Sequence, residues 1–179
     1  DEGRMAPNQR LKILGRESRD IVMLSGLVQD AIFVPTDMTI EDEKRRFVAV
    51  LNRFQWDRAA RLDAQDQDAG AADAKFQDDI SSGYTRSFAA LTVEGITGAR
   101  TKSIKRGSSD QFVSIMALVP DEKGLTIVCS GEAAIRLSGS NLRVFLEDLG
   151  EPWPTQRKPE HGDDLAAIVR DAPAVSQGD

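Results

Sequence analysis

The feature that most constrains the fold is a succession of short apolar segments, each closed by a turn signal, in the second half of the chain. Segments of this length and spacing are typical of strands joined by turns. They occupy residues 88–93, 99–104, 112–119, 125–130 and 133–137. Between the third and fourth, PDEKG (120–124) offers a proline to open a turn and a glycine that can adopt positive φ. We therefore expect a β-hairpin here and an antiparallel sheet overall.

A single amphipathic helix is predicted over residues 18–31, ahead of the strands. Its apolar residues recur at steps of three and four on one face: Ile21, Leu24, Val28 and Ala31. Ser18 can cap its start, and Asp20 suits the positive end of the helix dipole. Gly26 lowers helix stability, so we expect it to mark a close approach to the sheet.

Short strands are also expected between this helix and residue 54, at 32–34, 38–40 and 47–54. The run FVAVL in the last of them is apolar on both faces, which favours a central strand. Residues 141–149 fit a strand or a helix, and we favour the strand. Together with the helix, these segments predict an α+β fold: a curved antiparallel sheet of roughly seven to nine strands, a barrel or a pleckstrin-homology-like roll.

Two segments have the composition of irregular structure. Residues 63–83 combine aspartate with Ala, Gly and Ser, and we expect a mobile acidic loop there. The proline-rich stretch GEPWPTQRKPEHGDD is expected to be an extended tail, because proline cannot donate to a ladder. We expect one globular domain over 11–161, then a tail over 162–179 with one short helix at most before a disordered end.

Charge and cysteine content exclude several functional classes. The formal charge of −6 argues against nucleic-acid binding, which usually needs a basic excess. The one cysteine, Cys129, cannot form an internal disulfide, and no Cys/His cluster offers a metal site. We expect no metal and no cofactor. The first ten residues lack the apolar core of a secretory signal, and apolar runs such as 47–51 are far below the roughly 20 residues of a membrane span. We expect a cytoplasmic protein with no membrane contact.

Three segments resemble a small bacterial family described only as a domain of unknown function, number 2948. They are SGLVQDAI at the end of the predicted helix, KRRFVAVLNRFQWD, and AAIRLSGSNLRVFLEDLGEPW, with Pro159 to His161 beyond. The resemblance covers about residues 11–161 and departs in the acidic segment 63–83. It implies a bacterial cytoplasmic origin, and no catalytic residue is carried over from it.

Two isolated side chains are candidates for catalysis. Cys129 would need a base to act as a nucleophile, and the only histidine, His161, lies in the proline-rich tail. A buried structural thiol is the favoured interpretation of Cys129. His161 is a candidate contact residue because acidic neighbours could raise its pKa, although a solvated tail histidine is more common. No phosphate loop or serine elbow is present.

The basic cluster comprises Arg100, Lys102, Lys105 and Arg106. Alternation places Arg100 and Lys102 on one face of a strand, where they could bind an anion. A solvated edge strand is the favoured alternative, because edge lysines prevent mispairing.

Arg53 and Trp56 are the last candidate contact residues. At the end of a buried strand, Arg53 is expected to pair with a buried carboxylate, either Glu147 or Asp148. At a pocket rim it would instead bind an anionic ligand beside Trp56.

The leading functional hypothesis is a non-catalytic binding module that contacts a protein partner or a second copy. The alternative is a small-molecule or anion-binding domain with a pocket near Arg53 and Trp56, and an enzyme ranks third. A sizeable cavity with convergent polar groups would favour the alternative, and a flat apolar patch would favour a protein partner.

Overall fold

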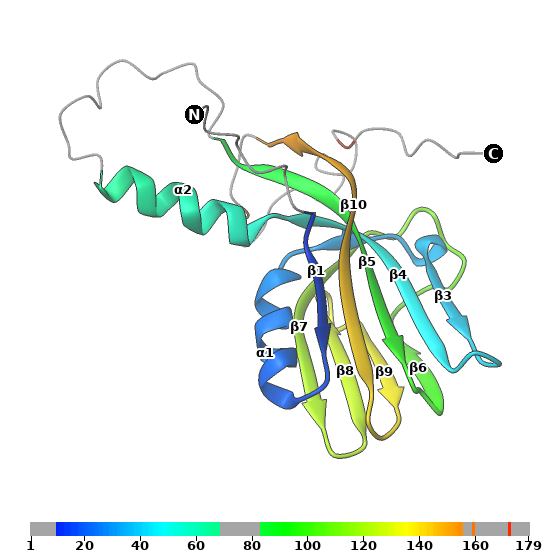
Figure 1. Cartoon of the computed structure of the whole chain (residues 1–179). Helices are drawn as coiled ribbons and strands as arrows, with labels where there is room; N and C mark the ends of the chain where they lie inside the picture. The colour runs from blue at the N-terminus through cyan, green and yellow to red at the C-terminus, as the bar shows by residue number, and fades with distance from the viewer. Residues whose placement is uncertain (1–9, 69–82, 156–158, 160–171, 173–179) are drawn as a thin grey trace.

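The computed structural model describes residues 10–68, 83–155, 159 and 172, with the backbone alone given for 65–68. This part of the chain forms one ten-stranded antiparallel sheet with two α-helices (Figure 1). In chain order the elements are β1 (Lys12–Gly15), α1 (Ser18–Leu27), β2 (Ile32–Phe33), the 3-10 helix η1 (Pro35–Asp37), β3 (Met38–Glu41), β4 (Arg46–Phe54), α2 (Trp56–Asp68), β5 (Thr85–Glu94), β6 (Gly98–Lys102), β7 (Val113–Asp121), β8 (Gly124–Cys129), β9 (Ala134–Ser138) and β10 (Arg143–Pro154).

The α+β class and the curved antiparallel sheet are confirmed. The strand order is β1-β10-β5-β4-β2-β7-β8-β9-β6, with β3 paired to β4, so β1, β3 and β6 each have one unpaired side. The sheet is thus an open, curled roll, and the expected alternative of a closed barrel is wrong. The strand that the sequence did not predict is β1, whose four residues are too few to establish an alternating pattern.

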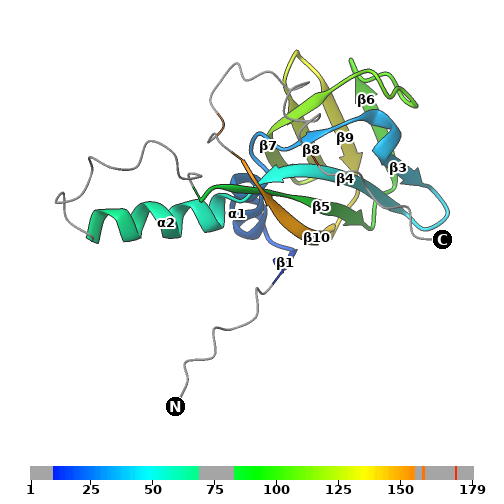
Figure 2. The same ribbon diagram turned by 90° about the horizontal axis from the view of Figure 1, so that it is seen from above.

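The core lies inside the curl of the sheet. The two-residue strand β2 joins one half, formed by β1, β10, β5, β4 and β3, to the other half, formed by β7, β8, β9 and β6. Figure 2 shows β4, β5 and β10 on one side of the curl and β8 and β9 on the other. On the inner face, Val144, Val93 and Phe47 lie in register across three strands, and all are buried against side chains of the other half.

Helix α1 packs along β7 and covers the edge of that strand beyond its short pairing with β2 (Figure 1). The backbone N–H of Leu118 donates to Ser25 Oγ at 2.9 Å, which satisfies a donor that no neighbouring strand reaches. The cap is Glu17 and not Ser18, because the Asp20 side chain accepts from the Glu17 N–H in a capping box. The helix ends at Leu27, short of the predicted residue 31, since Asp30 turns the chain with φ of 59°.

Gly26 does not approach the sheet, so that expectation is wrong. It lies on the exposed face of α1, and a Cβ at this position would meet no atom within 4 Å. The glycine therefore weakens the helix without any packing benefit inside the described chain.

Gly26→Ala is expected to raise the free energy of unfolding by about 0.5 to 1 kcal/mol, because alanine restricts the unfolded backbone and fits the helix. Chemical denaturation of dilute protein measures this change. Gly15→Ala is the matched control and should lower stability, because its Cβ would lie 2.8 Å from the Leu24 side chain. A destabilised Gly26→Ala variant would contradict the open surface at this position.

Helix α2 corrects the predicted loop over residues 63–83. Residues 63–68 continue α2, and residues 69–82 lie outside the described part. The helix is anchored by the buried Ala59 and by a hydrogen bond from the Tyr84 hydroxyl to Asp63 at 2.9 Å. Apart from Trp56 and the half-buried Leu62, the rest of the helix is mostly polar and projects away from the sheet (Figure 1), which is why its composition resembles that of a loop.

Strand β10 confirms the preferred interpretation of residues 141–149 and extends it to Pro154, into the stretch expected to be a tail. Its pairing with β5 shifts between Leu149 and Trp153, where Gly150 has φ of 65°. On its other side, the pairing with β1 reaches only to Glu147. The two prolines are tolerated because they occupy a part of the strand with one open side. The possible helix at 163–170 lies outside the described residues.

Candidate functional site

Arg53 is a buried arginine on the inner face of the sheet. Its guanidinium makes a two-pronged contact with Asp148 on β10, Nε to Oδ1 at 2.6 Å and NH2 to Oδ2 at 2.7 Å. NH1 donates to Asp57 in the first turn of α2 at 3.1 Å. The predicted pairing with a buried carboxylate is confirmed, and Asp148 is the partner.

Small residues on β5 make room for this ion pair. Arg53 is in register with Ser87, and Asp148 with Ala89, so the arginine crosses β5 diagonally above two short side chains. The Ser87 hydroxyl is buried and has no hydrogen-bond partner in the described part of the chain. The small volume of Ser87, rather than its hydroxyl, therefore suits the position.

The charge of Arg53 is held in place by its partners. Burial acts to lower the pKa of this guanidinium, but the hydrogen bonds and the attraction of Asp148 and Asp57 outweigh burial and leave the pKa above its ordinary value. Because Arg53 is fully buried and Asp148 is 6% exposed, the pair is screened from water. This arrangement ties β4 to β10 and to the start of α2, which is a structural role.

Trp56 lies beyond the end of β4 and does not converge with Arg53 on a common pocket. Its ring packs edge-on against the buried Phe54, with centroids 4.7 Å apart, and its indole N–H donates to the Gln29 carbonyl at 2.8 Å. Both polar groups of the predicted anion site therefore already have protein partners.

A second buried arginine, Arg86, lies on the outer face of the sheet beside Phe54. Its Nε donates to Asn52 Oδ1 at 2.7 Å and its NH2 to the Asn52 carbonyl at 3.1 Å. Sequence reasoning missed this residue, because an arginine at the start of a strand gives no sign of burial.

The basic cluster lies at the free edge of the sheet. Arg100 and Lys102 are both exposed on edge strand β6, as expected, and Lys105 and Arg106 are exposed in the loop that follows. Arg136 lies opposite Arg100 on β9, and its guanidinium donates two hydrogen bonds to the Asp121 carboxylate at 2.7 and 2.9 Å. This contact lowers the pKa of Asp121 to about 2. Nothing in this geometry aims the four cations at one point, and it agrees with the solvated-edge interpretation.

Cys129 is buried on β8, and burial raises the pKa of its thiol to about 12. A thiol with this pKa holds almost no thiolate near neutral pH. His161, its only possible histidine partner, lies outside the described residues. The favoured interpretation of Cys129 as a structural thiol is confirmed.

Cys129→Ser is expected to lower the free energy of unfolding by roughly 1 to 3 kcal/mol, because a hydroxyl would replace an apolar thiol in the core. Denaturant titration measures the loss, and Cys129→Ala is the control that removes the sulfur without adding a polar group. In the native protein we expect slow labelling by a thiol reagent. Rapid labelling at neutral pH would contradict burial.

Three surface hollows are candidate ligand sites. One of about 240 Å³ lies between the start of α1 and the β7–β8 turn. A second, of about 400 Å³, is lined by Arg16, Asn141, Leu142 and Arg143, and a third, of about 420 Å³, by Asp42, Arg45, Ile96, Thr97 and Gly98. Arg143 is engaged with Glu94, and Arg45 with the carbonyls of Gly95 and Ile96. Arg16 lines the first two hollows and is the one arginine there whose side chain makes no hydrogen bond or ion pair among the described residues. None of these three hollows presents convergent free donors.

The most unusual surface feature is an exposed apolar patch on α1 and β7. We define the α1–β7 patch as Val22, Met23, Gly26, Met116 and Val119. Its four large side chains are 66, 50, 52 and 47% exposed. Sequence reasoning missed the patch, although Val22 and Met23 fall on the face of the predicted helix opposite its core positions.

The protein thus has an α+β fold in which the buried charged side chains are held by other protein groups. Its exposed feature is the apolar α1–β7 patch. The sequence model described as "Protein of unknown function (DUF2948)" matches residues 11–161, so the chain belongs to this family. No curated protein and no solved structure matches the chain. Among the described residues, no helix has the length and apolar character needed to cross a bilayer, and no group of three His, Cys, Asp or Glu is placed to hold a metal ion.

Proposed function

We propose that the protein is a non-catalytic interaction module and that the α1–β7 patch is its binding surface. The observation that carries this proposal is the exposure of four large apolar side chains on two neighbouring elements. Covering one such half-exposed side chain completely stabilises a complex by roughly 1 to 1.5 kcal/mol, about half the value for a fully exposed one. Clustered apolar exposure of this kind marks protein contact sites more often than scattered exposure does.

The anion-binding alternative has less support. Its two residues, Arg53 and Trp56, donate to Asp148 and to the Gln29 carbonyl, and an anion would have to displace Asp148 from a buried pair. Removing one partner of such a pair leaves an uncompensated charge. The formal charge of −6 also disfavours polyanionic partners, and we place the module in the bacterial cytoplasm as part of this proposal.

Site-specific photo-crosslinking in cells tests the proposal. A photoreactive amino acid placed at Met23 or Met116 is expected to capture a protein. The matched control is Leu149, which is 37% exposed on β10, a strand that β5, β4 and β2 separate from β7 in the sheet. Capture from the control position with none from either patch position would overturn the assignment of the surface.

A further inference from the structure

We infer that the occupant of the α1–β7 patch is a second copy of this chain, with the two α1 helices packed antiparallel across a two-fold axis. This inference rests on the proposed function and names its partner. The supporting observation is that the outward faces of two α1 helices complement each other in an antiparallel arrangement.

The outward face of α1 holds a protruding side chain next to a gap. At 100° per residue, Arg19, Val22, Met23 and Gly26 lie on one side of the helix, opposite the buried Ile21, Leu24 and Val28. Met23 is half exposed, and Gly26 has open space where a Cβ would be. The helix therefore presents one flexible apolar side chain and, three residues later, a glycine that lets another chain approach its backbone closely.

In a dimer with a two-fold axis, the contact between Met23 of one copy and Gly26 of the other occurs twice. If Met23 of one copy enters the gap at Gly26 of the second copy, symmetry places the second Met23 over the first Gly26. A thioether side chain is well suited to fill such a gap, because it is unbranched and adaptable.

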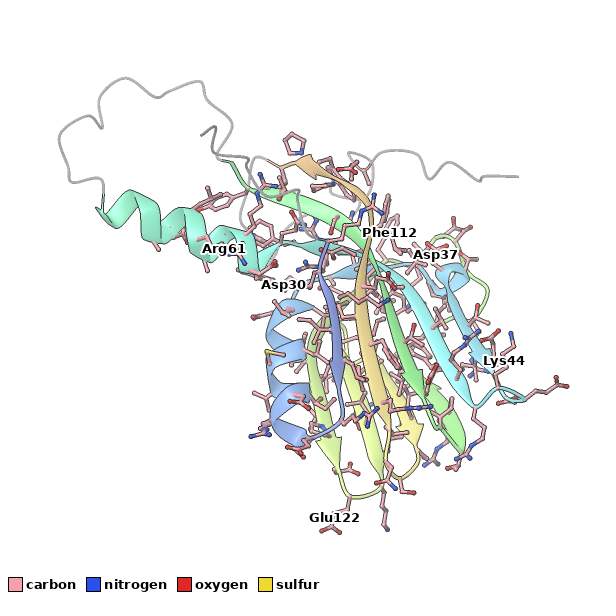
Figure 3. All side chains as sticks on the ribbon, viewed as in Figure 1. Asp30, Asp37, Lys44, Arg61, Phe112 and Glu122 are labelled. Carbon is pink, nitrogen blue, oxygen red and sulfur yellow. The ribbon has the colours of Figure 1, made fainter. Side chains whose placement is uncertain are left out.

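The charges on this face also complement one another in the antiparallel register. Arg19 forms an exposed ion pair with Glu17 of its own chain at 3.0 Å. In the dimer it would also lie beside the end of the other α1, whose last turn carries no basic residue. The C-terminal end of a helix attracts cations. Asp30 lies just past this end, near the start of α2 (Figure 3). A parallel arrangement would instead bring the two Arg19 side chains together.

Strand β7 widens the contact. Ser25 Oγ accepts the Leu118 N–H, so Val22, three residues before Ser25, lies on the side of α1 that faces β7. Met116 and Val119 on that strand extend the apolar surface beside the helix. A second copy seated on Met23 and Gly26 would approach these residues from the Val22 side of the helix, and the same contacts would repeat across the axis.

Cysteine pairing tests the register directly. Met23→Cys and Gly26→Cys are made separately in the full chain and mixed under mild oxidation. We expect the mixed disulfide dimer to form faster than a dimer of either variant alone. Native Cys129 contributes little background because it is buried. A mixed dimer no faster than the two self-dimers would overturn the antiparallel register.

Sedimentation equilibrium tests the dimer over about a hundredfold range of concentration. Met23→Glu should weaken dimerisation by at least about tenfold, whereas Leu149→Glu should not. Gly26→Ala should also weaken the dimer although it strengthens the isolated helix, a combination that a purely structural glycine would not give. A monomer throughout overturns the second copy and leaves the proposed function to the photo-crosslinking result. A dimer broken by Leu149→Glu and unaffected by Met23→Glu overturns the α1 interface.

Discussion

Arg53→Met is expected to lower the free energy of unfolding by about 3 to 5 kcal/mol, because it leaves Asp148 charged in the core without its partner. Methionine retains most of the apolar stem, so the loss reports charge more than packing. Arg53→Ala should cost at least as much. Equilibrium denaturation at matched salt measures all these variants.

The double variant Arg53→Met, Asp148→Leu is the decisive comparison. Removing both charges avoids the uncompensated carboxylate, so most of the lost stability should return. Asp57 keeps contact with water at 30% exposure and should tolerate the loss of Arg53. If Arg53→Met and the wild type are equally stable, the structural role is wrong and Arg53 becomes the first residue to examine for ligand binding.

Gly124→Ala is expected to lower the free energy of unfolding by about 3 kcal/mol, through backbone strain and a steric clash. Gly124 has φ of +153°, and a Cβ there would lie 2.0 Å from the carbonyl oxygen of Leu137 on β9. To relieve this contact, β8 and β9 would have to separate where Gly124 pairs with Ser138. Thermal or chemical denaturation measures the change.

Gly107→Ala is the matched control for Gly124→Ala. Gly107 also has a positive φ, of +77°, but nothing lies within 4 Å of its added Cβ. The free energy of unfolding of Gly107→Ala should therefore fall only by the cost of the backbone strain, about 1 to 2 kcal/mol. Equal losses in the two variants would show that the contact with Leu137 relaxes without cost.

The sequence could predict most of the strands because local chemistry determines them. The turn PDEKG closes the β7–β8 hairpin as expected, with Gly124 at positive φ. Strand β4 is central, as its apolar run indicated, because it lies between β5 and β2. The helix α2 was missed because most of its residues after Trp56 are polar or small, so that its second half has the composition of a loop.

For the candidate site residues, the sequence predicted the kind of environment but not the particular partner. Burial of Cys129 and a carboxylate partner for Arg53 followed from alternation along the strands. Sequence reasoning left Glu147 and Asp148 as equal candidates, and the register of β10 against β5 puts Asp148 on the inner face. The α1–β7 patch joins residues more than ninety positions apart, as the bond from Leu118 to Ser25 shows, and no local pattern links them.

The sequence by itself determined the α+β class, the position of α1, nine of the strands and the buried character of Cys129, because each depends on periodicity or turn chemistry within a few residues. Only the tertiary structure decided that the sheet stays open, that Arg53 binds Asp148, and that Gly26 faces outward beside Met23. These features depend on which strands pair and in which register. Such long-range choices are made by the packing of the whole core and not by any single segment.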